Sequence, residues 1–107
     1  MKIELVRLFD VYAPLLNERQ QEILSLYYNE DQSLAEIAEN VGITRQGVRD
    51  CIVKSEALLL GYEKALRLYG KFSEISSELD TLASMTGEKD ENGPLTQKIS
   101  EIKDMLV

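Results

Sequence analysis

The chain has 107 residues, of which 44% are hydrophobic and 29% charged, so it has room for one small folded domain and an extension. Its formal net charge of −7 argues against a general nucleic-acid binder, because affinity for phosphate comes from Lys and Arg. With no His and a single Cys, the sequence excludes histidine acid–base chemistry, a zinc finger and an intrachain disulfide.

The sequence contains no Gly-rich phosphate loop and no nucleophile beside a base, so we expect neither an enzyme nor a bound cofactor or metal. No apolar run approaches the ~20 residues of a membrane span, and the N-terminus lacks the apolar core of a signal peptide. We therefore expect a cytoplasmic protein without membrane insertion.

Two helices are predicted before residue 30. Apolar residues recur at helical spacing over residues 2–12, and Pro14 disfavours helix in the residue before it. Asn17 is a good capping residue for a second amphipathic helix over residues 18–28. In that helix Tyr27 falls at a core position and is expected to be buried, whereas Tyr28 is left open.

Residues 34–53, LAEIAENVGITRQGVRDCIV, have the pattern of a helix-turn-helix. This motif needs apolar residues where its helices face each other, a small residue at the crossing, and Gly for the turn. Ala38 supplies the small residue and Gly42 the turn, where a left-handed backbone is easiest. The predicted apolar packing positions are Ile37, Val41, Ile43, Val48 and Cys51.

Both helices of the motif also have local start signals. Ser33 and Glu36 have the spacing of a capping box, and Thr44 can cap the second helix. Val48, Cys51 and Ile52 would then point inward. The candidate DNA-binding surface on the outer face consists of Thr44, Arg45, Gln46, Arg49, Asp50 and Lys54. Arg and Gln can read base edges through two hydrogen bonds, but the alternative is a pair of helices that only pack together.

Basic residues gather after the motif although the whole chain is acidic. Between Thr44 and Lys71, six Lys and Arg residues stand against three carboxylates, so 6 − 3 gives +3 in this segment. This distribution favours contact with phosphate, and the alternative is that the charges lie on several solvated helix faces.

The segment LNERQQEILSLYYNEDQSLAEIAENVGITRQGV resembles region 4 of bacterial sigma factors, where a helix ending near an acidic loop leads into the same turn. Residues 5–72 resemble the YlxM family more closely still, through LYY before an acidic loop, the SLAEIAE helix and the tail SEALLLGYEKALRLYGKF. The resemblance implies a DNA-binding regulatory protein. Because genes of that family commonly lie beside that of the signal recognition particle GTPase, it also implies partners among signal recognition particle components.

The chain departs from the YlxM pattern at two positions of the second motif helix. Gly47 stands where Ala is usual, which weakens the helix by up to ~1 kcal/mol. Arg49 stands where the family often has an aromatic residue, and it adds a potential contact to phosphate or base.

After Asp50 the apolar period continues, so the second motif helix is predicted to extend into a long helix. Gly61 is tolerated inside it, and Gly70 is placed to end or kink it near Tyr69. A further apolar stripe then runs to Thr86. The predicted fold is all-α, a sigma region 4-like helix-turn-helix bundle with a long C-terminal helical extension.

The apolar surface of the extension exceeds what the two small N-terminal helices could cover. We therefore predict a homodimer, the alternative being a helical hairpin that folds back on its own core. The predicted dimer surface consists of Leu59, Tyr62, Leu66, Tyr69, Phe72, Ile75, Leu79 and Leu82.

Residues 87–94, GEKDENGP, have the composition of a linker and lack the spacing of a calcium-binding loop. Residues 95–107 are predicted to form a short amphipathic helix, which would be marginal alone and needs a surface to dock on. The predicted organisation is a helix-turn-helix domain over residues 1–60, a dimerisation extension over 61–86, a linker over 87–94 and a C-terminal helix over 95–107.

Two functions stay open at this point, a sequence-specific DNA-binding regulator and a protein-binding adaptor with the same fold. We favour the regulator. The affinity of a DNA reader falls steeply with salt, whereas an acidic adaptor binds a basic partner through its carboxylates.

Overall fold

A computed structural model describes residues 3–87 and 93–106, and every regular element within these ranges is helical. This confirms the all-α prediction. The chain divides into two compact units, Met1–Leu66 and Arg67–Val107. The division therefore falls after Leu66, whereas the sequence pattern had placed the end of the first domain at residue 60.

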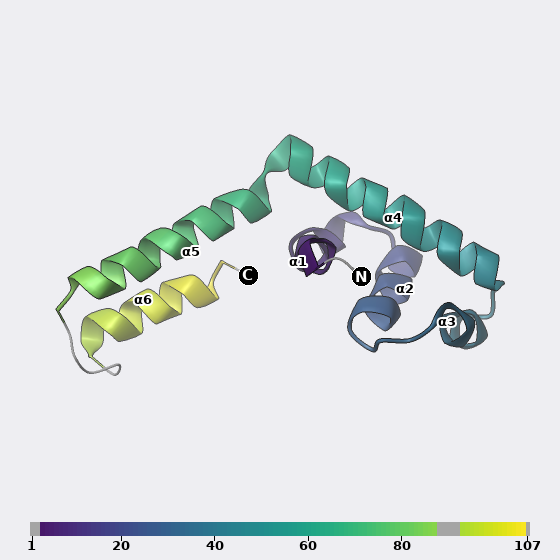
Figure 1. The fold of residues 1–107 in the computed structure, drawn as a ribbon, viewed down its shortest axis with the longest axis horizontal. Helices are drawn as coiled ribbons and strands as arrows, with labels where there is room; N and C mark the ends of the chain where they lie inside the picture. The colour runs from purple at the N-terminus through teal and green to yellow at the C-terminus, as the bar shows by residue number, and fades with distance from the viewer. Residues whose placement is uncertain (1–2, 88–92, 107) are drawn as a thin grey trace. The chain divides into compact units, whose positions relative to one another are not determined.

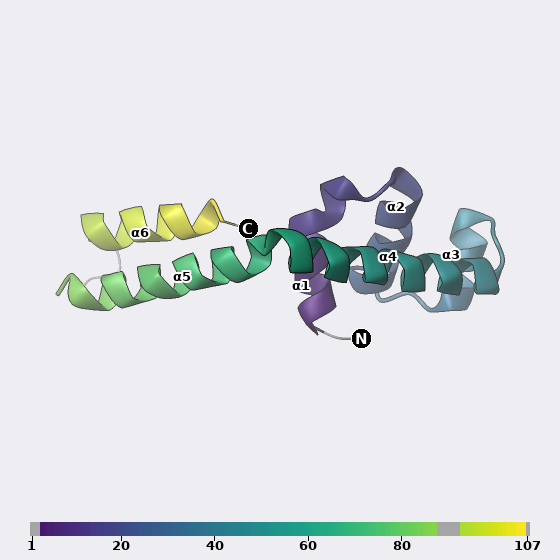
Figure 2. The same cartoon turned by 90° about the horizontal axis from the view of Figure 1, so that it is seen from above.

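Four α-helices form the first unit, and the longest of them organises it. They are α1 (Ile3–Tyr12), α2 (Glu18–Tyr28), α3 (Leu34–Val41) and α4 (Arg45–Leu66), with a 3₁₀ turn at Ala13–Leu15. The shorter helices α1, α2 and α3 all pack against α4 (Figures 1 and 2). The predicted bounds of α2 and the continuation of the second motif helix into a long helix are confirmed.

Apolar residues at helical spacing meet in one core. Its members are Leu5, Leu8, Phe9, Tyr12, Leu16, Ile23, Leu24, Tyr28, Ile37, Ala38, Val48, Ile52 and Leu59. In α4 the buried positions Val48, Ile52, Ser55 and Leu59 recur at steps of three and four, so one side of this helix faces the core over several turns. Since burying one large apolar side chain contributes about 1.5–3 kcal/mol, this stripe joins the motif firmly to α1 and α2.

Tyrosine side chains connect the C-terminal half of α4 to α1 and to the 3₁₀ turn that follows it. The Tyr12 hydroxyl donates a hydrogen bond of 2.6 Å to Glu63, and the Tyr62 hydroxyl donates one of 3.3 Å to the carbonyl of Leu15. The rings of Tyr12 and Tyr62 lie 5.9 Å apart, a separation at which aromatic pairs attract each other. The residues after position 60 therefore belong to the first unit because their side chains pack on it.

The long helix ends at Leu66, and the prediction that Gly70 ends or kinks it is wrong. Arg67 has the left-handed backbone angles φ 55 and ψ 29, and the next helix begins at Leu68 with Gly70 inside it. A left-handed non-glycine residue costs about 1–2 kcal/mol, so local preference opposes this break. The prediction that Gly61 is tolerated within the helix is confirmed.

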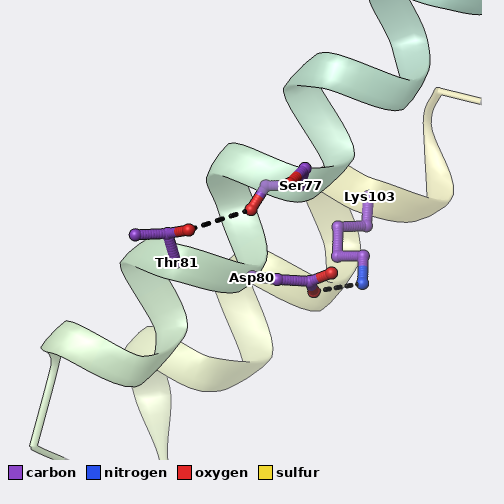
Figure 3. Close-up of polar contacts among 4 residues, drawn as sticks. All are labelled: Ser77, Asp80, Thr81 and Lys103. Atoms are coloured by element: carbon purple, nitrogen blue, oxygen red, sulfur yellow. Dashed lines mark hydrogen bonds and ion pairs between the residues drawn. The ribbon is translucent and has the colours of Figure 1, made fainter.

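The second unit is a helical hairpin of α5 (Leu68–Met85) and α6 (Pro94–Asp104), which run antiparallel side by side (Figures 1 and 2). The Lys103 ammonium lies 2.5 Å from the Asp80 carboxylate and joins the two helices (Figure 3). The same view shows the Thr81 hydroxyl donating to the Ser77 carbonyl one turn back on α5. Ile99 is buried in the hairpin, so α6 has the docking surface that its length requires.

The C-terminal helix begins at Pro94, one residue before the predicted start, and ends at Asp104. Pro is favoured at the first position of a helix, because its missing N–H has no intrahelical partner there. Of the predicted linker, residues 88–92 lie outside the described residues. None of the described helices is long and apolar enough to cross a membrane.

Candidate nucleic-acid interface

The turn and both helix starts of the motif have the predicted local structure. Gly42 adopts φ 80 and ψ 32 at the end of α3. Ser33 and Glu36 form a reciprocal capping box, with hydrogen bonds of 3.0 and 3.1 Å. The Thr44 hydroxyl accepts a bond of 3.0 Å from the backbone N–H of Gly47, so it caps α4. The entry angles of both helices are thus set by bonds within three residues of each start.

The capping box makes a testable contribution at acid pH. The backbone N–H and the hydroxyl of Ser33 hold the pKa of Glu36 below its usual value. A carboxyl whose pKa is lowered by folding stabilises the fold above its unfolded pKa, and this contribution is lost as the pH falls through the folded pKa. The Glu36→Gln variant cannot titrate at this position. We expect the melting temperature of the wild type minus that of Glu36→Gln to decrease when the pH is lowered below about 4. Thermal unfolding followed by circular dichroism checks this, and a difference independent of pH would contradict it.

The crossing of α3 and α4 is packed as predicted at its centre. Ile37 and Val48 are fully buried, and Ala38 is 8% exposed. Ile43 departs from the prediction, because it is 37% exposed. It lies in the turn just before the cap, and its Cδ1 is 3.5 Å from the point where a Cβ on Gly47 would stand. Ile43 therefore covers the first turn of α4 and contributes little to the crossing.

The two remaining predicted packing positions, Val41 and Cys51, are half-buried. The Cys51 sulfur lies 3.9 Å from the Ser55 hydroxyl, in reach of a weak hydrogen bond. Cys51 thus sits at the edge of the packed side of α4, next to the fully buried Ser55.

The outer face of α4 presents the whole predicted DNA-binding set to solvent. All six residues, Thr44, Arg45, Gln46, Arg49, Asp50 and Lys54, are exposed. Over residues 3–87 and 93–106, no carboxylate forms an ion pair with Arg45, Arg49 or Lys54. Three exposed cations along the N-terminal half of α4 are therefore available to an anionic partner. Arg45 and Arg49 lie about 40° apart around the helix, and Lys54 lies about 140° beyond Arg49.

One hydrogen bond within this surface was not predicted from the sequence. The Gln46 side-chain amide donates a bond of 2.8 Å to the Asp50 carboxylate, one turn further along α4. The spacing of four residues was the available signal, since such pairs meet on a helix surface. Asp50 therefore holds one of the two donors of Gln46 and places a negative charge among the cations.

A small pocket of about 240 Å³ lies beside the basic face. It is lined by Tyr27, Leu34, Arg49, Ile52, Val53 and Glu56. Its lining mixes apolar side chains with the opposite charges of Arg49 and Glu56, which stand seven residues apart on one side of α4. This pocket was not expected from the sequence, because its walls come from α2, α3 and α4.

Tyr28 is the buried member of the tyrosine pair, so the expectation that Tyr27 fills the core is wrong. Tyr27 is half-buried. The Tyr28 hydroxyl donates a hydrogen bond to the Glu56 carboxylate, and its ring meets Phe9 edge-on with centroids 5.7 Å apart. Burial raises the pKa of Tyr28, and the bond to Glu56 raises it further. Because its ring is buried, Tyr28 cannot stack on a base.

The predicted dimer surface is divided between the two units. Leu59 is fully buried in the core of the first unit and has no surface to offer a second chain. Tyr62 packs on Tyr12, also within the first unit. Ile75 and Leu82 on α5 are well exposed. The other members of the predicted surface are Leu66, which is exposed, and Tyr69, Phe72 and Leu79, which are half-buried.

The capped helices α3 and α4 are joined by a turn with a left-handed glycine, and α4 has an exposed polar face. These features define a helix-turn-helix protein. Within the described ranges, no group of three or more His, Cys, Asp or Glu side chains could hold a metal ion.

The chain belongs to the UPF0122 family, whose model carries the description "Putative helix-turn-helix protein, YlxM / p13 like" and matches residues 1–102. A UPF0122 protein of Oceanobacillus iheyensis is 40% identical over 98 residues, which cover 92% of this chain and 90% of that protein. One of Symbiobacterium thermophilum is 49% identical over 75 residues, 70% of each chain. One of Desulforamulus reducens is 50% identical over 70 residues, 65% of this chain and 60% of that protein. The resemblance to the YlxM family is therefore confirmed.

Proposed function

We propose that the protein binds duplex DNA with the N-terminal half of α4 in the major groove. The observation that carries this proposal is the exposed N-terminal half of α4, where Arg45, Arg49 and Lys54 have no ion-pair partner among the described residues. An α-helix fits the major groove, and the second helix of such a motif presents its first turns to the base edges.

The residues of this half of α4 suit different contacts. Arg45 and Gln46 stand in the first turn of α4, where base edges are reached first. Lys54 lies two turns further on, where a long cationic side chain reaches phosphate. The Thr44 hydroxyl already accepts the capping bond, yet its proton is still available to a phosphate oxygen.

We also propose that two chains act together. Each chain carries a net charge of −7, so the gain from a second chain is not in overall charge but in a second α4, which doubles the number of local contacts to DNA. Dimeric helix-turn-helix proteins bind two half-sites about one helical turn apart. Regulation within the signal recognition particle pathway is proposed from the YlxM resemblance alone.

A mobility-shift titration with the promoter of the protein's own operon tests DNA binding. Three phosphate contacts give a slope of log affinity against log salt near −2.7, so affinity should fall roughly 40-fold between about 50 and 200 mM salt. An Asp50→Asn variant belongs in the same series. It should lose specificity if Asp50 accepts from a cytosine amine, and gain general affinity if Asp50 repels the backbone.

The second candidate function is that of a protein-binding adaptor. The pocket that Arg49 and Glu56 line together with apolar residues, and the acidic charge of the chain, favour this alternative. If neither the wild type nor Asp50→Asn binds any duplex at low salt, the DNA-binding proposal fails and the adaptor takes its place.

A further inference from the structure

The hairpin of the second unit has a wide apolar face exposed to solvent. Ile75, Leu82 and Met85 on α5 are between 43% and 74% exposed. The exposed apolar residues of α6 and its C-cap are Leu95, Ile102 and Met105, between 37% and 81% exposed. Monomeric proteins rarely expose contiguous apolar patches of this kind without a binding partner.

Both exposed stripes lie on the same side of the hairpin. At 100° per residue, Ile75 and Leu82 stand about a quarter turn back from Ala83 and about 140–160° back from Asp80, the two residues of α5 that line a hollow shared with α6. Leu95, Ile102 and Met105 are displaced in the same sense, by about 40°, 60° and 120° from the buried Ile99. On each helix the exposed stripe is rotated in the same sense away from the side that contacts the other helix. Because the two helices are antiparallel, equal senses of rotation place both stripes on one face of the hairpin. Figure 3 shows the Asp80–Lys103 side of the contact.

The shape of the α5 part of this face suits an inserted partner helix. A hollow of about 510 Å³ runs along α5, lined by Ile75, Leu79, Leu82 and Met85. Glu74, Glu78 and Thr81 also line it, with Glu78 between Leu82 and Met85 around the helix.

The hairpin also has too small a core to be stable by itself. The second unit comprises residues 67–107, and among its described residues Ile99 alone is buried. Domains of about 40 residues usually need a disulfide, a metal or oligomerisation. The single Cys of the chain lies at position 51, in α4, so a disulfide within this unit is not available. A further apolar surface must supply the missing burial.

A second copy of this chain meets that need best. In a dimer with a two-fold axis the same patch of each chain contacts the other, so two copies of this face can cover each other. The six side chains of Ile75, Leu82, Met85, Leu95, Ile102 and Met105 expose roughly 600–700 Å² per chain, close to the ~800 Å² per partner of a standard interface.

We infer that the α5–α6 hairpins of two chains pack face to face as a four-helix bundle, in which α6 supplies about half of the interface. This inference deepens the self-association proposed above, and it does not depend on DNA binding. It replaces Leu59 and Tyr62 of the sequence-based dimer surface with Leu95, Ile102 and Met105 of the C-terminal helix. The C-terminal helix is thus an oligomerisation element.

Light scattering of the full chain tests the interface one helix at a time. The wild type at tens of micromolar is expected to have about twice the 12.1 kDa chain mass. Leu82→Glu on α5 and Ile102→Glu on α6 are each expected to weaken the dimer at least about 10-fold, because a charge is placed in the apolar centre. Leu60→Glu is the matched control, since Leu60 is 51% exposed against 48% for Leu82 but lies on α4 in the first unit. Ser77→Glu is a second control on α5 itself.

Amide hydrogen exchange of the wild type tests the inferred α5–α6 interface without any variant. Protection of α5 and α6 should rise between roughly 1 and 100 µM protein, whereas protection of α1 to α3 should not depend on concentration. A monomeric wild type, or exchange in α5 and α6 that ignores concentration, overturns the inference. Dimers that survive Ile102→Glu overturn the part assigned to α6. A monomer that still binds duplex DNA would contradict the dimer interface but not the DNA-binding proposal. A dimer that binds no duplex would contradict the DNA-binding proposal but not the interface.

Discussion

Replacing Ile37 by Ala is expected to lower the free energy of unfolding of the first unit by ~2–5 kcal/mol. Ile37 has no exposed surface and lies where α3 crosses α4. Its truncation removes apolar contacts and leaves a cavity, because the close crossing at Ala38 prevents the helices from moving together. Urea unfolding followed by circular dichroism measures the loss. DNA binding should weaken in parallel, since the crossing sets the direction of α4.

Ile43→Ala is the matched control, with the same chemical change six residues along the chain. Both isoleucines occupy predicted packing positions of the motif, but Ile43 is 37% exposed. Its truncation should cost less than ~1.5 kcal/mol, because water already reaches the side chain and no closed cavity forms. Equal losses for the two variants would show that the turn is packed more tightly than the structure indicates.

Replacing Arg45 by Ala is expected to relax the preference for one base pair by ~1–3 kcal/mol. The reason is its place in the first turn of α4, where a guanidinium can form two hydrogen bonds to a guanine edge. Lys54→Ala should instead weaken binding to all sequences alike and reduce the salt slope by roughly 1. Competition between a preferred duplex and single-base variants of it, at two salt concentrations, separates the two effects.

Lys64→Ala provides the control for charge alone. Lys64 is an exposed cation on the same helix, but it stands ten residues beyond Lys54, about 15 Å further along the axis. It should leave both affinity and salt slope nearly unchanged. If Arg45→Ala and Lys54→Ala have indistinguishable effects on every duplex, then α4 touches phosphate only and does not read base edges.

Much of the candidate site could be predicted because it depends on local bonds. The capping boxes at Asn17 and Ser33, the Thr44 cap and the left-handed Gly42 each involve residues no more than three apart. Such hydrogen bonds are favoured by these residues at this spacing, before any tertiary contact forms. The outer face of α4 follows directly, since a helix start and a period of 3.6 residues decide which side chains share a face.

The choice between neighbouring apolar residues required the packed structure. Successive residues differ by 100° around a helix, so a pattern identifies a broad stripe but not its centre. The direction from which α4 approaches α2 buries Tyr28 and leaves Tyr27 half-buried, and the same contact brings Glu56 to the Tyr28 hydroxyl. Leu59 belongs to the core for the same reason, although its spacing also suited a dimer surface.

The end of α4 shows the limit of local reasoning most clearly. Helix propensity and the spare conformational freedom of glycine both pointed to Gly70, yet the chain turns at Arg67 in a strained left-handed conformation. Tyr62 and Glu63 hold the last turns of α4 on the first unit, whereas α5 packs with α6 in the second. The sequence by itself thus determined where the helices start and which faces are apolar. Only the tertiary structure decided which residue breaks the long helix, because the packing of two separate units outweighs about 1–2 kcal/mol of backbone strain at a single residue.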